Sequence, residues 1–183
     1  MTARSEHQGK WSITFGVNDA DAVDQLLRSL PNWFGIEASN RAYVESARTL
    51  PTYFARPASS AADSDLPVGV LLAHRHFPEA AEIHLMAVAP ELHRRGVGRA
   101  LVQALEADLI GDGCKLLQVK TLGPTHPDDG YKLTRQFYAS MGFLPVEETF
   151  DLWDAQNPCL IMVKPLAQPA GSDGTAFART TFP

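Results

Sequence analysis

The chain has 183 residues, of which 45% are hydrophobic and 20% are charged, and its formal net charge is −5. This length and composition fit a single globular domain with a sizeable core. The acidic balance disfavours binding to nucleic acid or to an anionic membrane, and no apolar stretch reaches the roughly 20 residues of a spanning helix. We therefore expect neither a nucleic-acid partner nor a membrane partner.

The two ends of the chain differ from the middle in composition. Residues 1–10 are polar, contain no secretory signal, and are expected to be a flexible N-terminus. Residues 166–183 are rich in Ala, Gly, Ser, Thr and Pro, which is typical of a flexible tail. A single domain is therefore expected over residues 11–165. Two cysteines are too few for a disulfide framework, which favours a reducing compartment and a cytoplasmic location.

The first half of this domain alternates short strands with helices. Residues 11–15 alternate apolar and polar side chains, as a half-buried strand does. Asn18 or Asp19 can cap a helix that runs to Leu30, and a weaker apolar stripe predicts a helix over residues 37–49. Further strands are predicted over residues 52–55, 68–73 and 82–89, with a hairpin loop over residues 57–67.

The second half continues this alternation. A helix that opens at Gly96 places apolar residues at helical spacing until Gly111 or Gly113 ends it. A strand is predicted over residues 116–121, and a helix over about residues 131–141. Two late strands, residues 143–150 and 160–163, close the chain. Strands interrupted by helices around one core indicate an α/β fold.

The most informative segment is the turn that follows the apolar run ending at Ala89. It reads His93-Arg-Arg-Gly-Val-Gly98 and opens a long helix. A helix N-terminus offers unpaired N–H donors and a partial positive charge, so the turn is suited to a phosphate group. No lysine follows the glycines as in a P-loop, and Leu101 stands where a dinucleotide fingerprint needs its third glycine. The turn is therefore expected to hold the pyrophosphate of another nucleotide-bearing cofactor.

This pattern resembles the Gln/Arg-x-x-Gly-x-Gly/Ala signature of the GNAT superfamily of N-acetyltransferases, with His93 departing at its first position. The segment Phe137-Tyr-Ala-Ser-Met-Gly-Phe143 is similar to the family's Tyr-x-x-x-Gly-Phe helix end. The order of elements over residues 11–165 also agrees. The resemblance implies a GNAT-type α/β (α+β) fold, with a mixed, mostly antiparallel sheet of about six to seven strands flanked by helices. It also implies that the sheet is splayed between its fourth and fifth strands.

The resemblance further implies acetyl-CoA as cosubstrate, and no metal. The pantetheine arm would lie between the splayed strands, where Met86 and Val88 offer backbone groups and the Met86 N–H polarises the thioester carbonyl. The residues implied for the pyrophosphate are Arg94, Arg95, Gly96, Val97, Gly98 and Arg99. The family often has an asparagine seven residues before its helix tyrosine, where this chain has Tyr131.

Acetyl transfer to an amine requires a base for the amine proton and an acid for the departing sulfur. Tyr138 matches the family's general acid. Glu82 lies four residues before Met86, where histone-type relatives carry a catalytic glutamate that acts directly or through water. His84 is an alternative base, because its ordinary pKa suits proton transfer near neutral pH. In a regular strand, Glu82, His84 and Met86 would share one face.

The acceptor is expected to be a small-molecule or peptide amine that binds near the loop after the first helix. The candidate pocket residues are Trp33, Phe34, Glu37, His84 and Trp153. Core packing between the first two helices is an equally good interpretation of Trp33 and Phe34. His74 and His76 have no carboxylate or cysteine at ligand spacing, so we expect polar surface residues there and no metal site.

Two functional hypotheses remain open from the sequence. The first is an acetyl-CoA-dependent N-acetyltransferase that moves an acetyl group directly to a primary amine in a ternary complex. The second is a CoA-binding regulatory module with the same fold and little catalysis, because a fold does not guarantee an activity. Dimers are common in the superfamily, so a homodimer is one expected quaternary state.

Overall fold

The computed structural model describes residues 4–8, 10–16, 18–59 and 66–167. Its centre is an eight-stranded sheet with the strand order β1-β2-β3-β4-β5-β6-β8-β7. The strands are β1 (Arg4–Gln8), β2 (Trp11–Phe15), β3 (Thr52–Pro57), β4 (Gly69–Phe77), β5 (Ala80–Val88), β6 (Leu116–Leu122), β7 (Leu144–Asp154) and β8 (Asn157–Pro165). The helices are α1 (Ala20–Arg28), α2 (Glu37–Ser46), α3 (Val97–Gly111) and α4 (Asp129–Ser140), with a short 3-10 turn at Pro90–Leu92.

All neighbouring strands run antiparallel except β5 and β6, which are parallel. This confirms the predicted α/β fold with a mixed, mostly antiparallel sheet. The sheet gains a strand because Arg4–Gln8, expected to be flexible, pairs with β2.

The predicted C-terminal tail was expected to begin at residue 166, which is too early. Leu166 is only 6% exposed, and its N–H donates to the Lys115 carbonyl at 2.8 Å. Residues 1–3 and 168–183, and residues 60–65 of the predicted hairpin loop, lie outside the described residues.

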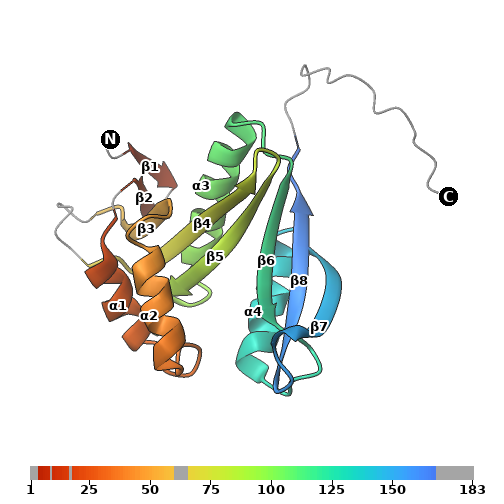
Figure 1. The fold of residues 1–183 in the computed structure, drawn as a ribbon. Coiled ribbons are helices and arrows are strands. Elements are labelled where there is room, and N and C mark those ends of the chain that lie inside the picture. Colours follow the sequence, from red (N-terminus) through yellow and green to blue (C-terminus); the bar gives the residue numbers. More distant parts are fainter. Residues whose placement is uncertain (1–3, 9, 17, 60–65, 168–183) are drawn as a thin grey trace, which may run out of the picture.

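The helices cover the sheet on both faces and divide the core into two clusters (Figure 1). On one face, Val23 and Leu27 of α1 pack against Phe54 of β3 and neighbouring strand residues. On the other face, the buried side of α3 packs with α4 and the opposite side of the strands. The predicted cap of α1 is confirmed at Asp19, whose carboxylate accepts the Ala22 N–H at 3.0 Å.

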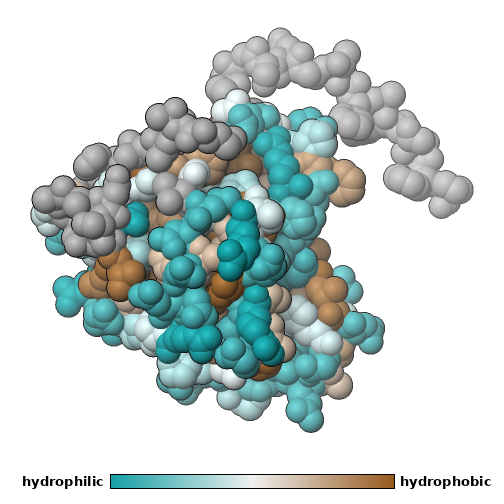
Figure 2. All heavy atoms as spheres, turned by 60° about the vertical axis from the view of Figure 1, so that its left-hand side comes forward, coloured by the Kyte–Doolittle hydropathy of each residue, from teal (hydrophilic) through white to brown (hydrophobic). Residues whose placement is uncertain are grey.

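The outer surface of the α1 and α2 layer is polar. Figure 2 turns this side of the molecule forward and shows mostly hydrophilic residues with scattered hydrophobic ones. Polar side chains such as Asp21, Arg41 and Glu45 are exposed on these two helices. Among the described residues, no helix combines the length and the apolar character that crossing a membrane requires.

The sheet splits between β5 and β6. These strands pair only over Ala80–Ile83 and Leu116–Val119, and beyond that point they diverge (Figure 1). The remainder of β6, from Lys120 to Leu122, pairs with β8 alone. The predicted splay between the fourth and fifth predicted strands is therefore confirmed, since those strands are β5 and β6.

A β-bulge at His84 reverses the alternation of β5 at the start of this split. Leu85 lies opposite Leu72, whereas Ile83 lies opposite Ala73, so His84 is an extra residue in the ladder. Ile83 consequently points into the α3 side of the core. Leu85, two residues later, points into the α1 side instead of returning to the α3 side.

This bulge corrects the expectation that Glu82, His84 and Met86 share one face. Glu82 precedes Ile83 in the regular part of the strand and therefore points to the α1 and α2 side. Met86 follows the bulge and packs against the α3 side of the core. The prediction assumed regular alternation, and the extra residue at His84 breaks it.

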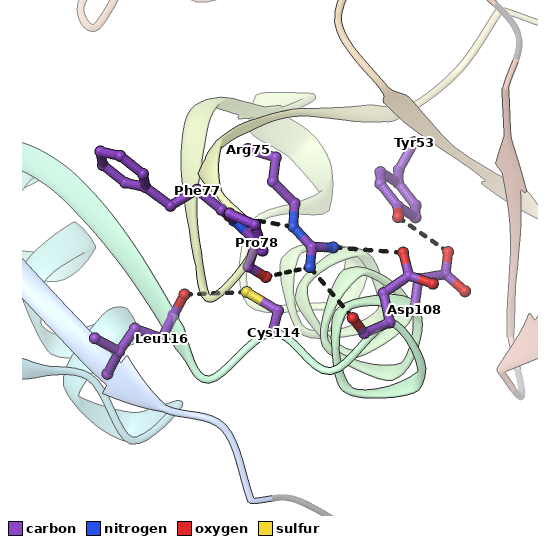
Figure 3. A network of polar contacts seen from close by, with 8 residues as sticks. Tyr53, Arg75, Phe77, Pro78, Asp108, Cys114 and Leu116 are labelled. Carbon is purple, nitrogen blue, oxygen red and sulfur yellow. Dashed lines mark hydrogen bonds and ion pairs between the residues drawn. The ribbon is translucent and has the colours of Figure 1, made fainter. Parts of the chain in front are cut away.

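A polar network fixes the closed end of the split (Figure 3). Arg75 of β4 donates to the carbonyl oxygens of Phe77 and Asp112, each at 3.3 Å, and to that of Pro78. Its Nη1 also lies 3.5 Å from Oδ2 of Asp112. Because Asp112 ends α3, the guanidinium sits where the helix dipole favours a positive charge. The β4–β5 turn and α3 are thereby held together.

Candidate active site

The turn between β5 and α3 has an unusual backbone. Arg94 has a φ of 60° and Gly96 a φ of 90°. A left-handed conformation is unfavourable for a residue with a side chain, and such strain concentrates at functional sites. Trp11 of β2 stabilises the turn, because its Nε1–H donates to the Arg95 carbonyl at 3.1 Å.

The first turn of α3 lies directly beside this strained turn. The amides of Val97, Gly98 and Arg99 have no acceptor within the helix, because they are its first residues. A Cβ on Gly98 would lie 3.3 Å from Cζ of Phe137, so this glycine permits α3 and α4 to approach closely. The three arginine side chains of the segment are exposed, and they are Arg94, Arg95 and Arg99. These features together suit a pyrophosphate group.

The backbone groups of Met86 and Val88 face the split. The Ala89 N–H donates to the Val68 carbonyl of the segment before β4 at 2.9 Å. Since antiparallel pairs alternate, Met86 and Val88 direct their N–H and C=O groups away from β4. β6 does not pair with β5 there, so the Met86 N–H lies on the open side. The Val88 carbonyl is engaged within the chain, because Nε2 of His93 donates to it at 2.8 Å.

Tyr138 lies on α4, on the α3 side of the sheet, and is 4% exposed. Its ring meets Phe137 and Phe143 edge-on, at centroid distances of 5.3 Å and 5.4 Å. Burial, together with the neighbouring Tyr131, raises the pKa of Tyr138 above its ordinary value. The phenol therefore carries its proton at neutral pH, as a proton donor must.

Glu82 lies on the other side of the sheet at the point where β5 and β6 begin to separate, and it is 6% exposed. Its Oε2 accepts hydrogen bonds from His76 at 2.7 Å, Lys120 at 2.8 Å and Gln118 at 2.9 Å. Burial alone would raise the pKa of Glu82, but the bonds from Lys120, His76 and Gln118 outweigh it and lower that pKa. Glu82 is consequently a fixed anion.

His84 lies on the same side as Glu82, beside two further rings. Its ring centroid is 5.5 Å from that of Tyr43 on α2 and 6.4 Å from that of His74 on β4. Burial lowers the pKa of His84, although the Glu82 charge opposes the shift. The imidazole is therefore neutral at neutral pH and able to accept a proton.

The predicted acceptor residues divide into two groups. Trp33 and Phe34 lie near the site, in the loop between α1 and α2, and Phe34 meets Tyr43 edge-on at 6.1 Å. Glu37 is exposed, and its carboxylate lies 3.6 Å from Nη1 of Arg28 on α1. Trp153 is 45% exposed near the end of β7. For Glu37 and Trp153, the described residues show no contact with Glu82, His84 or Tyr138.

Sequence reasoning missed the partners of Glu82. Gln118 and Lys120 alternate on β6 with buried Leu117 and Val119, which marks them as one polar face of that strand. The pattern was visible, but it gives no sign of which carboxylate these side chains meet. The strand order, which places Gln118 directly opposite Glu82, supplies that information.

Two comparisons with known proteins agree with this geometry. The model of the acetyltransferase (GNAT) family matches residues 22–143. A proposed GNAT-family acetyltransferase from Desulfovibrio desulfuricans is 21% identical, with a TM-score of 0.70 over 85% of this chain and 99% of that one. The ribosomal-protein-S18-alanine N-acetyltransferase from Escherichia coli is 16% identical, with a TM-score of 0.66 over 90% and 99% of the two chains.

A third similar structure is a GNAT family acetyltransferase from Elizabethkingia anophelis with acetyl-CoA bound. It is 15% identical, with a TM-score of 0.63 over 87% of this chain and 100% of that one. No curated protein sequence matches the chain. At these identities the solved structures support only the fold of this chain. Its membership of the family rests on the family model.

Proposed function

Because the chain belongs to the acetyltransferase (GNAT) family, we propose that it is an acetyl-CoA-dependent N-acetyltransferase acting on a primary amine. The observation that carries this proposal is the split between β5 and β6. Tyr138 belongs to α4, which packs beside β6 on the α3 side of the sheet, and Glu82 and His84 lie on the opposite side. We propose that Tyr138 as proton donor and a residue of the opposite side as proton acceptor serve this one opening, as direct transfer in a ternary complex requires.

The residues around the split fit acetyl-CoA. The free amides at the start of α3 and the exposed side chains of Arg94, Arg95 and Arg99 would hold the pyrophosphate. The Met86 N–H, on the open side of β5, would donate to the thioester carbonyl oxygen. When bound, acetyl-CoA supplies an activated acetyl carbon whose bond to sulfur breaks as a bond to the amine nitrogen forms.

Tyr138 is proposed as the general acid. Its hydroxyl is protonated at neutral pH and would pass that proton to the departing sulfur, although burial raises its pKa and so makes it a weaker donor. It lies on the α3 side of the sheet, whereas the Met86 N–H lies in the plane of the sheet at the unpaired edge of β5. The acid would therefore act from one face of the sheet and the polarising donor from the edge of β5.

Two residues compete for the role of general base, and the geometry favours His84. Glu82 was expected to fill this role, directly or through water. Its lowered pKa makes it a weaker proton acceptor, because three donors already stabilise its charge. His84 is neutral and stands on the same side. We propose that His84 receives the amine proton and that the Glu82 anion stabilises the resulting imidazolium.

The acceptor amine would reach the split from the side that carries Tyr43, His84 and Glu82. On this side no helix covers β6 among the described residues, since α1 and α2 pack on β3, β4 and β5. Similar structures include an enzyme named for the alanine of a ribosomal protein, so a peptide amine and a small-molecule amine both remain candidates. Two cysteines in the chain are too few for a disulfide framework, which supports a proposed cytoplasmic location.

The decisive experiment measures CoA release from acetyl-CoA with a panel of primary amines. Tyr138→Phe should lower kcat by about 10²- to 10⁴-fold while acetyl-CoA still raises the melting temperature. The acid limb of the pH–rate profile should disappear in His84→Asn, whereas Glu82→Gln should shift that limb to lower pH.

Three results would contradict parts of this proposal. Unchanged turnover in Tyr138→Phe across pH would remove its role as acid. An acid limb lost in Glu82→Gln and kept in His84→Asn would return the base role to Glu82. Acetyl-CoA binding without turnover of any amine would favour a CoA-binding regulatory module instead.

A further inference from the structure

The loop between α1 and α2 bridges the two halves of the sheet at the open end of the split. The Trp33 ring meets the His93 ring edge-on, at a centroid distance of 5.3 Å, on the β5–α3 side. The Trp33 carbonyl accepts a hydrogen bond from the Tyr131 hydroxyl of α4 at 3.3 Å. β5 and β6 do not pair beyond Ile83 and Val119. The two Trp33 contacts therefore connect the β5–α3 turn with α4 where no strand pairing connects the two halves of the sheet.

The Trp33 indole also packs directly on the start of α4. A Cβ on Gly130 would lie 3.3 Å from Cζ2 and 3.5 Å from Cε2 of Trp33. Any larger residue at position 130 would therefore push the indole away. Glycine at this position allows the ring to lie against the α4 backbone.

The loop that carries Trp33 is itself firmly held. The Trp33 and Phe34 N–H groups donate to the Leu30 carbonyl at 3.0 Å and 2.9 Å. Asn40 of α2 is 5% exposed, and its Nδ2 donates to the Phe34 carbonyl at 2.7 Å. Trp33 is thus presented on a fixed support rather than on a loose loop.

Both contacts come from positions where the chain departs from the signature it otherwise resembles. His93 stands at the first signature position, and Tyr131 stands seven residues before Tyr138. Although His93 and Tyr131 are 38 positions apart in the sequence, both side chains reach Trp33. The two departures therefore have one structural role in common.

We propose that Trp33, held by His93 and Tyr131, forms a strap across the open end of the split that retains bound acetyl-CoA. This inference rests on the proposed function. A pantetheine arm lying between β5 and β6 passes under the strap, between the α3 N-terminus and Tyr138. Release of acetyl-CoA requires the strap to open, which breaks the Tyr131–Trp33 hydrogen bond and the His93–Trp33 ring contact. Trp33 is a positioning residue and takes no part in proton transfer.

The test measures the rate at which radiolabelled acetyl-CoA leaves the full-length protein during a chase with unlabelled acetyl-CoA. Tyr131→Phe removes one hydroxyl and should speed release about two- to tenfold. Trp33→Leu should speed release at least as much, because it removes the indole from both His93 and Gly130. Trp33→Phe keeps an aromatic ring for the His93 contact but loses the indole atoms that pack on Gly130, so its release rate should lie between those of wild type and Trp33→Leu.

Tyr53→Phe is the matched control. It also removes a phenol hydroxyl from a hydrogen bond, to Oδ2 of Asp108 at 2.9 Å, but at the closed end of the split (Figure 3). Its release rate should equal that of wild type. Because Tyr131→Phe is a mild change, it keeps the test valid even if Trp33→Leu fails to fold.

The strap and the proposed function fail in different ways. Release rates of Tyr131→Phe and Trp33→Leu within twofold of Tyr53→Phe would overturn the strap while leaving acetyl-CoA binding intact. A wild-type protein that binds no acetyl-CoA would overturn the proposed function itself, and the strap with it.

Discussion

Replacing Gly69 by alanine should both destabilise the protein and weaken binding at the proposed acetyl-CoA site. Gly69 begins β4 beneath the N-terminal half of α3. A Cβ placed there would lie 2.7 Å from Cγ1 of Val97, 3.2 Å from Cδ1 of Leu101 and 3.4 Å from the Ala87 carbonyl oxygen. Carbon atoms in contact normally sit about 3.5–4.0 Å apart, so the shortest of these contacts is about 1 Å too close.

The neighbours of Gly69 have little freedom to relieve this overlap. Val97 is 1% exposed and Leu101 is fully buried. A β-branched side chain in a helix has essentially one χ1 rotamer, so Val97 is unable to swing aside. α3 must move instead, which costs about 1–3 kcal/mol of the free energy of unfolding, as other overpacked cores do. Its first turn carries the amides proposed to bind pyrophosphate, so acetyl-CoA should bind more weakly.

The assay is urea unfolding followed by circular dichroism, with the acetyl-CoA-induced shift in melting temperature as a second readout. Gly111→Ala provides the matched control, because its added Cβ would meet nothing within 4 Å near the other end of α3. That variant should gain up to about 1 kcal/mol from helix propensity and keep the full acetyl-CoA shift. A Gly69→Ala protein as stable as Gly111→Ala would refute the steric argument.

Two further predictions concern charged side chains near the start of the split. Because the pKa of Glu82 is lowered in the folded state, its stabilisation is fully present above the ordinary glutamate pKa of about 4.3 and is lost as the pH falls through the lowered value. Urea unfolding at a series of acidic pH values should therefore show a smaller decline in Glu82→Gln than in wild type. An equal decline would show that other carboxylates carry the effect. At the closed end, Arg75→Met should cost about 1–2 kcal/mol of unfolding free energy, since it leaves the carbonyls of Phe77 and Asp112 without their charged donor. Arg48→Met, which removes an exposed pair with Glu45, should change stability little, and equal losses in the two variants would argue against the Arg75 network.

Features that depend on neighbouring residues were readable from the sequence. The turn at His93–Gly98 is the clearest example, because a strand end, a helix start and two glycines are consecutive in the chain. The cap at Asp19 and the buried side of α3 follow from equally local rules. Tyr138 was identified from the short segment around it and lies buried next to the α3 side of the core.

Features that depend on strand register or on distant partners were not readable. A β-bulge adds one residue to a ladder without a sequence signal, and the bulge at His84 decided that Glu82 and Met86 face opposite sides. The pairing of β1 with β2 likewise depends on a strand register, and the polar sequence of residues 4–8 does not specify one.

The charge state of Glu82 in the candidate site also depends on the tertiary structure. Glu82 meets His76 from β4 and Gln118 and Lys120 from β6, and these partners make it a fixed anion. In the same way, Trp33 was a pocket residue or a core residue by sequence, and only the fold brought His93 and Tyr131 to it. The sequence alone determined where a helix start presents unpaired backbone N–H groups, because backbone geometry at a helix start is local. The tertiary structure decided which side chains share each face of the split, because that depends on contacts between residues far apart in the chain.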